Sequence, residues 1–264
     1  MKSCYLFLLV FISQPLCSYT QIKWPHDAKA AIVLSYDDGM HSHLNTAIPQ
    51  LDQYGLKGTF FINNITGRNE AVSWMNAAGK GHELANHTLN HPCPAATGNS
   101  WPAHFTTEVY SIPRYIHEIR ITNEILSIVD PNAKYTTFAY PCNNTIIGNA
   151  DILAAIKKSK LVKYARGGGK PMQIVTDFKS LHFLHVPSWP IPEGTSADAF
   201  IEYANKVKNA GGLGIYQFHG IGDQWIKTSK EDHEALLLYL SLHKNEYWVA
   251  TFKEVMEYVE KNKQ

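Results

Sequence analysis

The sequence has few cysteines, little net charge, no low-complexity linker and no internal repeat. Lys and Arg total 24 against 23 Asp and Glu, so the formal net charge is only +1. A chain this close to neutral gives no electrostatic reason to bind nucleic acid or an anionic membrane, and we expect neither as a partner. Its 264 residues are enough for one large domain with a proper core.

The N-terminus has the pattern of a secretory signal peptide. Lys2 precedes an apolar run, 5–12, and small residues follow at Cys17 and Ser18. The run is too short to remain as a membrane span. We therefore expect cleavage of residues 1–18, a single domain over 19–264, and a secreted or periplasmic protein. Lipid attachment at Cys17 is the alternative, although the bulky Leu16 does not favour it.

Two of the four cysteines, Cys93 and Cys142, remain after cleavage. In an oxidising compartment such a pair can close one disulfide, which would join two loops near the motifs described below. Two free buried thiols are the alternative, and the sequence leaves both open.

The segment 31–39 is predicted to be a buried strand that ends in two adjacent carboxylates, Asp37 and Asp38. Parallel strands that are covered on both faces carry functional groups at their carboxyl ends. Two neighbouring Asp residues repel each other, and a cation would neutralise them. An ordinary Asp-Asp-Gly turn is the alternative.

Apolar patterns of strand and helix type alternate along the rest of the chain. This alternation predicts an α/β protein with a parallel barrel or sheet, whose strand ends share one face. That face would gather Asp37, Asp38, His87, His91, Cys142, Arg166, Trp189 and His219. Strands are expected at 31–39, 57–62, 82–85, 135–140, 161–166, 181–186, 212–218 and 247–251, and helices at 42–54, 71–78, 107–129, 147–159, 197–208, 230–243 and 252–262.

His87 and His91 have the spacing that places two imidazoles on one side of a helical turn. With 13 His in the chain, roughly 0.6 such pairs arise by chance, so the pair gains weight only from the acidic pair on the preceding strand. One Asp and two His leave coordination positions of a metal ion open for water and substrate. The second Asp could act as a general base and His219 as a general acid.

Four motifs resemble those of the polysaccharide deacetylases, the NodB-homology or family-4 carbohydrate esterases. They are Ser-Tyr-Asp-Asp-Gly (35–39), His-Thr-Leu-Asn-His (87–91), Ala-Tyr-Pro-Cys (139–142) and the strand that ends in His219. The resemblance implies a distorted (β/α)7-type barrel that removes acetyl groups from sugars. It implies Asp37 as the base, Asp38, His87 and His91 as ligands of a divalent ion, usually zinc, and His219 as the acid. The backbone amide at Cys142 would stabilise the oxyanion, with Tyr140 nearby in the substrate site.

Several positions depart from the family pattern. Ala139 stands where many members place an Arg that orients the base; Arg166 is our candidate replacement, with a surface Arg as the alternative. The motif that usually steadies the acid His is not recognisable, and we leave that role empty. Gln217 stands where Leu is usual. Trp189 is expected to bind substrate as an apolar wall or sugar platform, or else to be a core residue.

We therefore expect a secreted, zinc-dependent polysaccharide deacetylase that acts on N-acetylated or O-acetylated glycans. A hydrolase of non-peptide C–N bonds in small molecules is one alternative, and a carbohydrate-binding barrel without catalysis is another. The second alternative predicts a missing base or ligand, yet Asp37, Asp38, His87, His91 and His219 are all present.

Overall fold

The computed structural model of the chain describes residues 22–97, 102–131, 133–134 and 136–263. The predicted signal peptide and Cys17 lie outside these residues. None of the described helices is long and apolar enough to cross a membrane.

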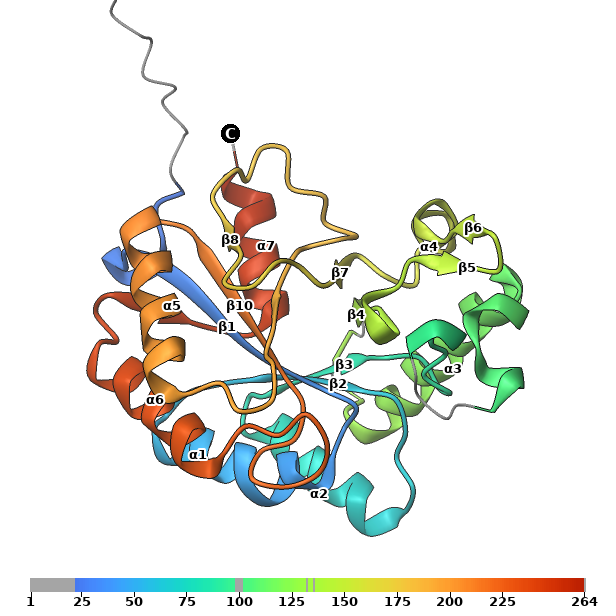
Figure 1. Cartoon of the computed structure of the whole chain (residues 1–264), viewed down its shortest axis with the longest axis horizontal. Coiled ribbons are helices and arrows are strands. Elements are labelled where there is room, and N and C mark those ends of the chain that lie inside the picture. Colours follow the sequence, from blue (N-terminus) through green and yellow to red (C-terminus); the bar gives the residue numbers. More distant parts are fainter. Residues whose placement is uncertain (1–21, 98–101, 132, 135, 264) are drawn as a thin grey trace, which may run out of the picture.

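A curled, mainly parallel sheet forms the centre of the molecule (Figure 1). Its strands follow the order β7-β4-β3-β2-β1-β10-β8, while β11 also pairs with β1 and β9 with β10. Only β8 among these pairings runs antiparallel to its neighbour. The strands are β1 (Ala30–Asp37), β2 (Thr59–Ile62), β3 (Glu83–Asn86), β4 (Thr137–Ala139), β7 (Tyr164–Arg166), β8 (Ile174–Val175), β9 (Trp189–Pro190), β10 (Leu213–Phe218) and β11 (Tyr247–Val249).

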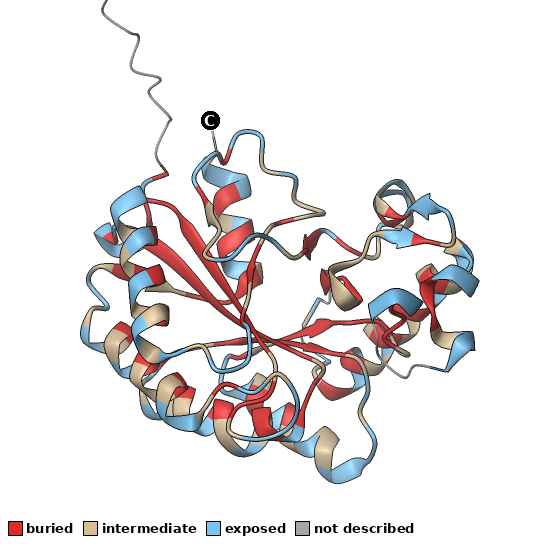
Figure 2. Ribbon diagram, in the orientation of Figure 1, coloured by how far each residue is buried: buried red, intermediate tan, exposed pale blue. Residues whose placement is uncertain are grey.

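Helices cover both faces of this sheet, as the alternating pattern predicts. Their outward surfaces are exposed and their inward surfaces buried, whereas the strands are buried almost throughout (Figure 2). Polar side chains cap several helix starts; for example, Thr251 and Glu254 form a capping box at α7. The helices are α1 (Ile48–Gln53), α2 (Arg68–Gly79), α3 (Ile112–Val129), α4 (Leu153–Ser159), α5 (Ala197–Ala210), α6 (Lys230–Leu242) and α7 (Phe252–Asn262).

Strand β1 is central, and all eight of its residues are buried. It pairs with β10 along most of its length, from Ala31 opposite Leu213 to Tyr36 opposite Phe218. Its other edge pairs first with β11 and then with β2. The prediction of a strand covered on both faces is therefore confirmed.

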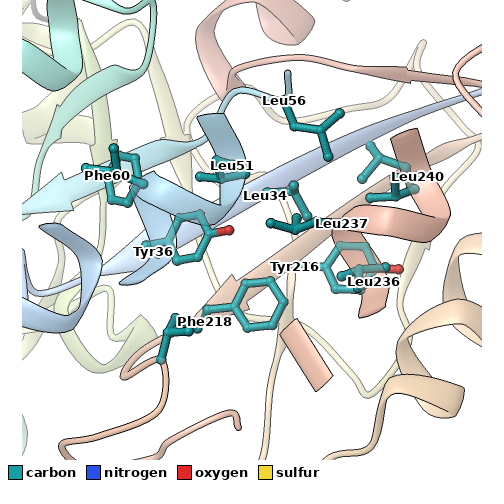
Figure 3. Packing of buried hydrophobic residues seen from close by; sticks show 14 of the residues in the cluster. Leu34, Tyr36, Leu51, Leu56, Phe60, Tyr216, Phe218, Leu236, Leu237 and Leu240 are labelled. Carbon is teal, nitrogen blue, oxygen red and sulfur yellow. The ribbon is translucent and has the colours of Figure 1, made fainter. Parts of the chain in front are cut away.

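The two faces of β1 contribute to different parts of the core. Ile32, Leu34 and Tyr36 pack with residues of α1, α2, α5 and α6. Figure 3 shows Leu34 and Tyr36 near Leu51 of α1 and near the leucines of α6. Ala31 and Val33 pack on the opposite face, together with α7. Side chains alternate along a strand, so Asp37 lies on this second face. By the same alternation, Arg166 lies on the same face as Tyr164, and Gln217 lies on the same face as Ile215. Asp37, Arg166 and Gln217 are therefore on one face of the sheet.

The expected strand over 181–186 does not form. A turn closes there, where His185 N donates to the carbonyl of His182 at 2.8 Å. Only Val186 forms a bridge, opposite Arg166. Further on, Ile191 N donates to the carbonyl of Gln217 at 3.0 Å. The segment thus runs from the edge of β7 to the edge of β10, and it places β9, which the sequence did not predict.

Two predicted helices are shorter than expected. Residues 147–159 begin with a hairpin of β5 (Ile146–Ile147) and β6 (Ala150–Asp151), with Gly148 in the left-handed region, and only then form α4. The helix expected from 107 starts at Ile112 instead, because the Ser111 side chain caps it by accepting from Arg114 N.

Candidate metal centre and active site

A closed ring of four buried polar side chains holds Asp37 at the end of β1. Arg166 Nη2 donates to both carboxylate oxygens, at 2.7 and 2.6 Å. Gln217 Nε2 donates to Oδ2 at 3.0 Å, and Arg166 Nη1 donates to Ser188 Oγ at 3.2 Å. The Ser188 hydroxyl shares its proton between Gln217 Oε1 (2.9 Å) and the carbonyl of Gly167 (2.8 Å). We call Asp37, Arg166, Ser188 and Gln217 the Asp37 ring.

Every member of the Asp37 ring is at most 3% exposed. Arg166 is fully buried, and its guanidinium carbon lies 5.0 Å from the centre of the Phe61 ring. Arg166 is therefore not a surface residue, and it contacts Asp37 as expected of a replacement for the missing Arg at position 139. Nη2 contacts both oxygens of Asp37 while Nη1 donates to Ser188, and these charge-assisted bonds together with the bond from Gln217 hold the carboxylate in place.

The charges around Asp37 keep it ionised. Burial alone would raise the pKa of Asp37, but the positive charge of Arg166, followed by His87 and His219, holds it below its ordinary value. Asp37 is consequently a carboxylate at neutral pH and can accept a proton.

Asp38, His87 and His91 converge beside the Asp37 ring. Asp38 Oδ1 lies 3.1 Å from His91 Nε2 and 3.5 Å from His87 Nε2. One potential ligand atom from each of the three residues lies within 4.8 Å of the other two. Both oxygens of Asp38 are buried; Oδ1 has the two imidazoles beside it, and Oδ2 has no hydrogen-bond partner among the described residues. Buried carboxylate oxygens of this kind require a cation or a proton close by.

The His87 imidazole is held by a hydrogen bond that leaves Nε2 free to bind a cation. His87 Nδ1 lies 2.8 Å from the carbonyl of Ala139, an acceptor, so Nδ1 carries the proton and Nε2 presents its lone pair to Asp38. Burial lowers the pKa of His87 to about 4, which keeps the ring neutral. Burial also lowers the pKa of His91, but the neighbouring Asp38 carboxylate outweighs it and the net shift is upward. One carboxylate and two imidazoles are ligands that zinc accepts in catalytic sites, so these residues fit a divalent ion.

The loop that carries the two imidazoles is not the helical turn that their spacing predicted. Thr88 and His91 have φ values of 60° and 48°, in the left-handed region, and Asp38 has 78°. Side chains within the loop support it: Asn86 Oδ1 accepts from Thr88 N at 2.8 Å, and Thr88 Oγ1 from His91 N at 3.1 Å. A left-handed conformation costs an L-residue about 1–2 kcal/mol, and such strain concentrates at functional sites.

His219 follows β10 at the same end of the sheet. Its backbone carbonyl lies 2.8 Å from Nε2 of the buried His43, and His43 Nδ1 accepts from Met40 N at 3.2 Å. His43 thereby connects the turn after β1 to the end of β10. Nδ1 of His219 has no hydrogen-bond partner among the described residues. Within the part of the chain that the structure describes, the role of orienting the His219 imidazole thus remains empty, as it did in the sequence.

A disulfide joins Cys93 to Cys142, with 5.7 Å between their Cα atoms. It ties the loop after His91 to the loop after β4, and Cys93 Sγ lies 3.5 Å from His91 Nδ1. Of the two alternatives that the sequence left open, the structure has the disulfide.

Two adjoining clefts open onto these groups. One, of about 420 Å³, is lined by residues that include Asp37, His87, Cys142, Gln217 and His219, and we call it the reaction cleft. The other, of about 310 Å³, includes Asp38, Asn63 and Asn64, and we call it the side cleft. His91 and Trp225 line both. Of the predicted residues, six line these clefts, namely Asp37, Asp38, His87, His91, Cys142 and His219, and Arg166 is buried behind Asp37.

Tyr140 and Trp189 do not line these clefts. Tyr140 is fully buried, and its hydroxyl donates to the carbonyl of Leu184 at 2.8 Å. It follows Ala139, which faces the site side of the sheet, so alternation turns Tyr140 to the other face. Trp189 is only 3% exposed and packs edge-on against Tyr203, with ring centres 4.9 Å apart. Both predictions of substrate contact are wrong, and the core alternative for Trp189 is correct.

Sequence reasoning missed three residues of the site. For Gln217 the sequence showed only that it stands where Leu is usual, although alternation along β10 places it beside Asp37. Trp225 follows His219 in a short Gly-rich loop after a site strand, which is where functional residues concentrate. Ser188 gave no signal, because its position depends on the irregular segment before β9.

Comparisons with known proteins agree with this geometry. A family model described as polysaccharide deacetylase matches residues 25–161. A gellan lyase from Bacillus sp is 22% identical over 261 residues, covering 89% of this chain and 10% of the relative, so the chain spans about a tenth of the length of that relative. A putative polysaccharide deacetylase from Mycobacterium smegmatis has a TM-score of 0.66 at 14% identity, covering 92% of this chain and 94% of that chain.

A second solved structure is a family 4 acetyl xylan esterase from Clostridium thermocellum in complex with a cobalt ion. It has a TM-score of 0.53 at 16% identity and covers 86% of this chain and 90% of that chain. At such identities these likenesses show the fold alone. They confirm the prediction of a distorted (β/α)7-type barrel.

Proposed function

Because this chain belongs to the polysaccharide deacetylase family, we propose that it is a metal-dependent hydrolase that removes acetyl groups from a glycan. The observation that carries this proposal is the meeting of three groups where the two clefts adjoin: Asp37 in its ring, the Asp38–His87–His91 cluster, and His219. Acyl hydrolysis needs a base, an acid and stabilisation of negative charge on the carbonyl oxygen.

We assign the metal to Asp38, His87 and His91 and propose zinc as the ion. When bound, the ion supplies Lewis acidity, which polarises the acyl carbonyl and lowers the pKa of the attacking water. The fixed tautomer of His87 and the buried oxygens of Asp38 support this assignment.

Asp37 is the proposed general base. As a water oxygen forms its bond to the acyl carbon, Asp37 takes one proton from that water, and the Asp37 ring holds the carboxylate in place. His219 donates a proton to the leaving nitrogen or oxygen of the sugar as the bond to the acyl carbon breaks, and acetate is released. The backbone N–H of Cys142, in the reaction cleft, would donate to the oxyanion, and the disulfide to Cys93 supports the position of its loop.

We further propose that the protein acts outside the cytoplasm, secreted or periplasmic, after removal of residues 1–18. The disulfide supports this proposal, because disulfides persist mainly in oxidising compartments. A lipid-anchored form attached through Cys17 is the alternative.

Acetate release tests the proposed function. The purified protein is stripped of metal, reloaded with zinc and incubated with N-acetylglucosamine oligomers, peptidoglycan and acetylated xylan. We expect acetate from at least one polymer with zinc and none after stripping. Asp37→Asn should abolish turnover while zinc stays bound, since Asp37 is not among the proposed ligands.

Two outcomes contradict the proposal. Full activity of Asp37→Asn would show that Asp37 is not the base. No acetate from any of the glycans, with turnover of small N-acyl compounds, would favour the alternative of a small-molecule C–N hydrolase.

A further inference from the structure

We infer that Trp225 is a sugar-binding platform, and that the glycan extends across it from the reaction cleft into the side cleft. This inference rests on the proposed function and names the form of its substrate: an oligosaccharide or polysaccharide of at least two pyranose units, not a monosaccharide.

The position of Trp225 is the first argument. Among the described residues, two line both clefts: Trp225 and His91, a proposed metal ligand. Its indole centre lies 5.2 Å from the imidazole centre of His219, the proposed acid. A substrate that reaches from one cleft to the other therefore passes the Trp225 side chain directly beside the reacting groups.

Its exposure is the second argument. Trp225 is 45% exposed, whereas Trp24, Trp74 and Trp189 are at most 3% exposed. A large aromatic surface left open to water within a depression usually marks a binding surface. The apolar C–H face of a pyranose ring stacks on such a surface, while its hydroxyl groups stay free for hydrogen bonds at the ring edge.

The loop that carries Trp225 is built to hold it there. Both neighbours, Gln224 and Ile226, have φ in the left-handed region, at 65° and 47°. The loop is closed at its base, where Gly222 N donates to the carbonyl of Thr228 at 2.7 Å. Such backbone strain persists only where surrounding contacts enforce it, and it concentrates at functional sites.

A side-chain anchor connects this loop to the site. Gln224 Oε1 accepts from the backbone N of Ser42 at 3.2 Å and from Ser42 Oγ at 2.8 Å. Ser42 Oγ in turn accepts from Ile221 N at 3.2 Å. Since Ser42 follows the Asp37–Asp38 turn closely, Trp225 is held relative to both carboxylates.

The side cleft supplies the polar partners of a second sugar. Asn63 and Asn64, on the loop after β2, line it, and Asn64 is exposed. Their amides can both donate to and accept from sugar hydroxyls. With about 310 Å³, the side cleft has the size of a small-molecule site. The acetylated unit would lie in the reaction cleft and its neighbour on Trp225 and these amides.

The test compares Trp225→Ala and Trp225→Phe with the wild type on a short and a long substrate. The matched control is Leu242→Ala, an exposed residue of α6 that lines neither cleft. For Trp225→Ala we expect kcat/KM on the N-acetylglucosamine hexamer to fall about tenfold, mostly through KM. Activity on 4-nitrophenyl acetate should fall by a clearly smaller factor, because this ester does not reach the side cleft. Trp225→Phe should recover most of the lost kcat/KM, since it keeps an aromatic face.

Binding without turnover provides the second readout. Zinc-loaded Asp37→Asn is titrated calorimetrically with the hexamer, with and without Trp225→Ala, and Kd should rise about tenfold when the indole is removed. Equal Kd values, or equal loss on the hexamer and on 4-nitrophenyl acetate, would overturn the platform. If the wild type releases no acetate from any glycan, the proposed function fails, and titration of the wild type and Trp225→Ala still decides whether Trp225 binds the hexamer.

Discussion

The Asp37–Arg166 pair allows the energetics of the site to be tested directly. Arg166 is fully buried and Asp37 is 2% exposed, so the guanidinium has no contact with water and the carboxylate reaches water only at the reaction cleft. Removing one member of a buried pair leaves an uncompensated charge and typically costs about 3–5 kcal/mol. A native domain has only about 5–15 kcal/mol of stability. We expect Arg166→Met and Asp37→Asn each to lower the free energy of unfolding by about 3 kcal/mol or more.

The double variant Arg166→Met/Asp37→Asn leaves neither charge in the interior. Its free energy of unfolding should therefore fall by less than the sum of the decreases in the two single variants, with a coupling energy of about 2 kcal/mol. The assay is urea unfolding at pH 7, followed by circular dichroism in the presence of EDTA, so that metal binding does not contribute.

Arg166→Lys is the control for this double-mutant cycle of Arg166 and Asp37. It keeps the positive charge but has no second nitrogen to donate to Ser188 Oγ, as Arg166 Nη1 does, so the Asp37 ring is opened. We expect it to fold, and to lose roughly 100-fold in kcat because the carboxylate is no longer held in one position. A coupling energy below about 0.5 kcal/mol would refute the reasoning, because that is the size expected of sites that do not interact.

Three further measurements test other parts of the structure. His87→Ala should lower zinc affinity by about 100-fold or more in calorimetry, and stoichiometric zinc in that variant would contradict the ligand assignment. Burial lowers the pKa of His233 to about 3, below its unfolded value of about 6.5, so its contribution to stability is present above pH 6.5 and is lost as the pH falls toward 3. Between pH 7 and 5, protonation of this group alone should lower the free energy of unfolding of the wild type by about 2 kcal/mol. The decrease measured by urea unfolding over the same pH range should therefore be about 2 kcal/mol smaller in His233→Gln, and an equal decrease in both proteins would contradict this account. The disulfide closes a 49-residue separation, so the double variant Cys93→Ser/Cys142→Ser should lose about 4 kcal/mol in urea unfolding, and a loss under about 1 kcal/mol would mean that the bridge does not constrain the unfolded chain.

Long elements with a clear apolar pattern could be predicted from the sequence. Strand β1, strand β10 and helix α5 lie close to where their patterns place them, because each is regular over its whole length. The segment 181–186 could not be predicted, since four of its six residues are apolar, as in a buried strand, while a local turn at 182–185 breaks the pairing. The loop 87–91 also differs from the helical turn that its histidine spacing predicts. The side chains of Asn86 and Thr88 accept hydrogen bonds from backbone N–H groups of the loop, and these bonds favour a left-handed bend.

The order of the residues alone indicates which chemical groups are present and which strand ends carry them. Asp37, Asp38 and His219 follow apolar runs, His87 and His91 follow a short predicted strand, and parallel strands bring their carboxyl ends to one edge. Which of these groups touch one another depends on how the whole chain folds. Arg166 lies 129 positions from Asp37 and Gln217 lies 180, and no local pattern encodes such distances. Tyr140 and Trp189 were misplaced for the same reason: the face of a sheet that a side chain occupies depends on register and packing, which become definite only when the whole barrel assembles.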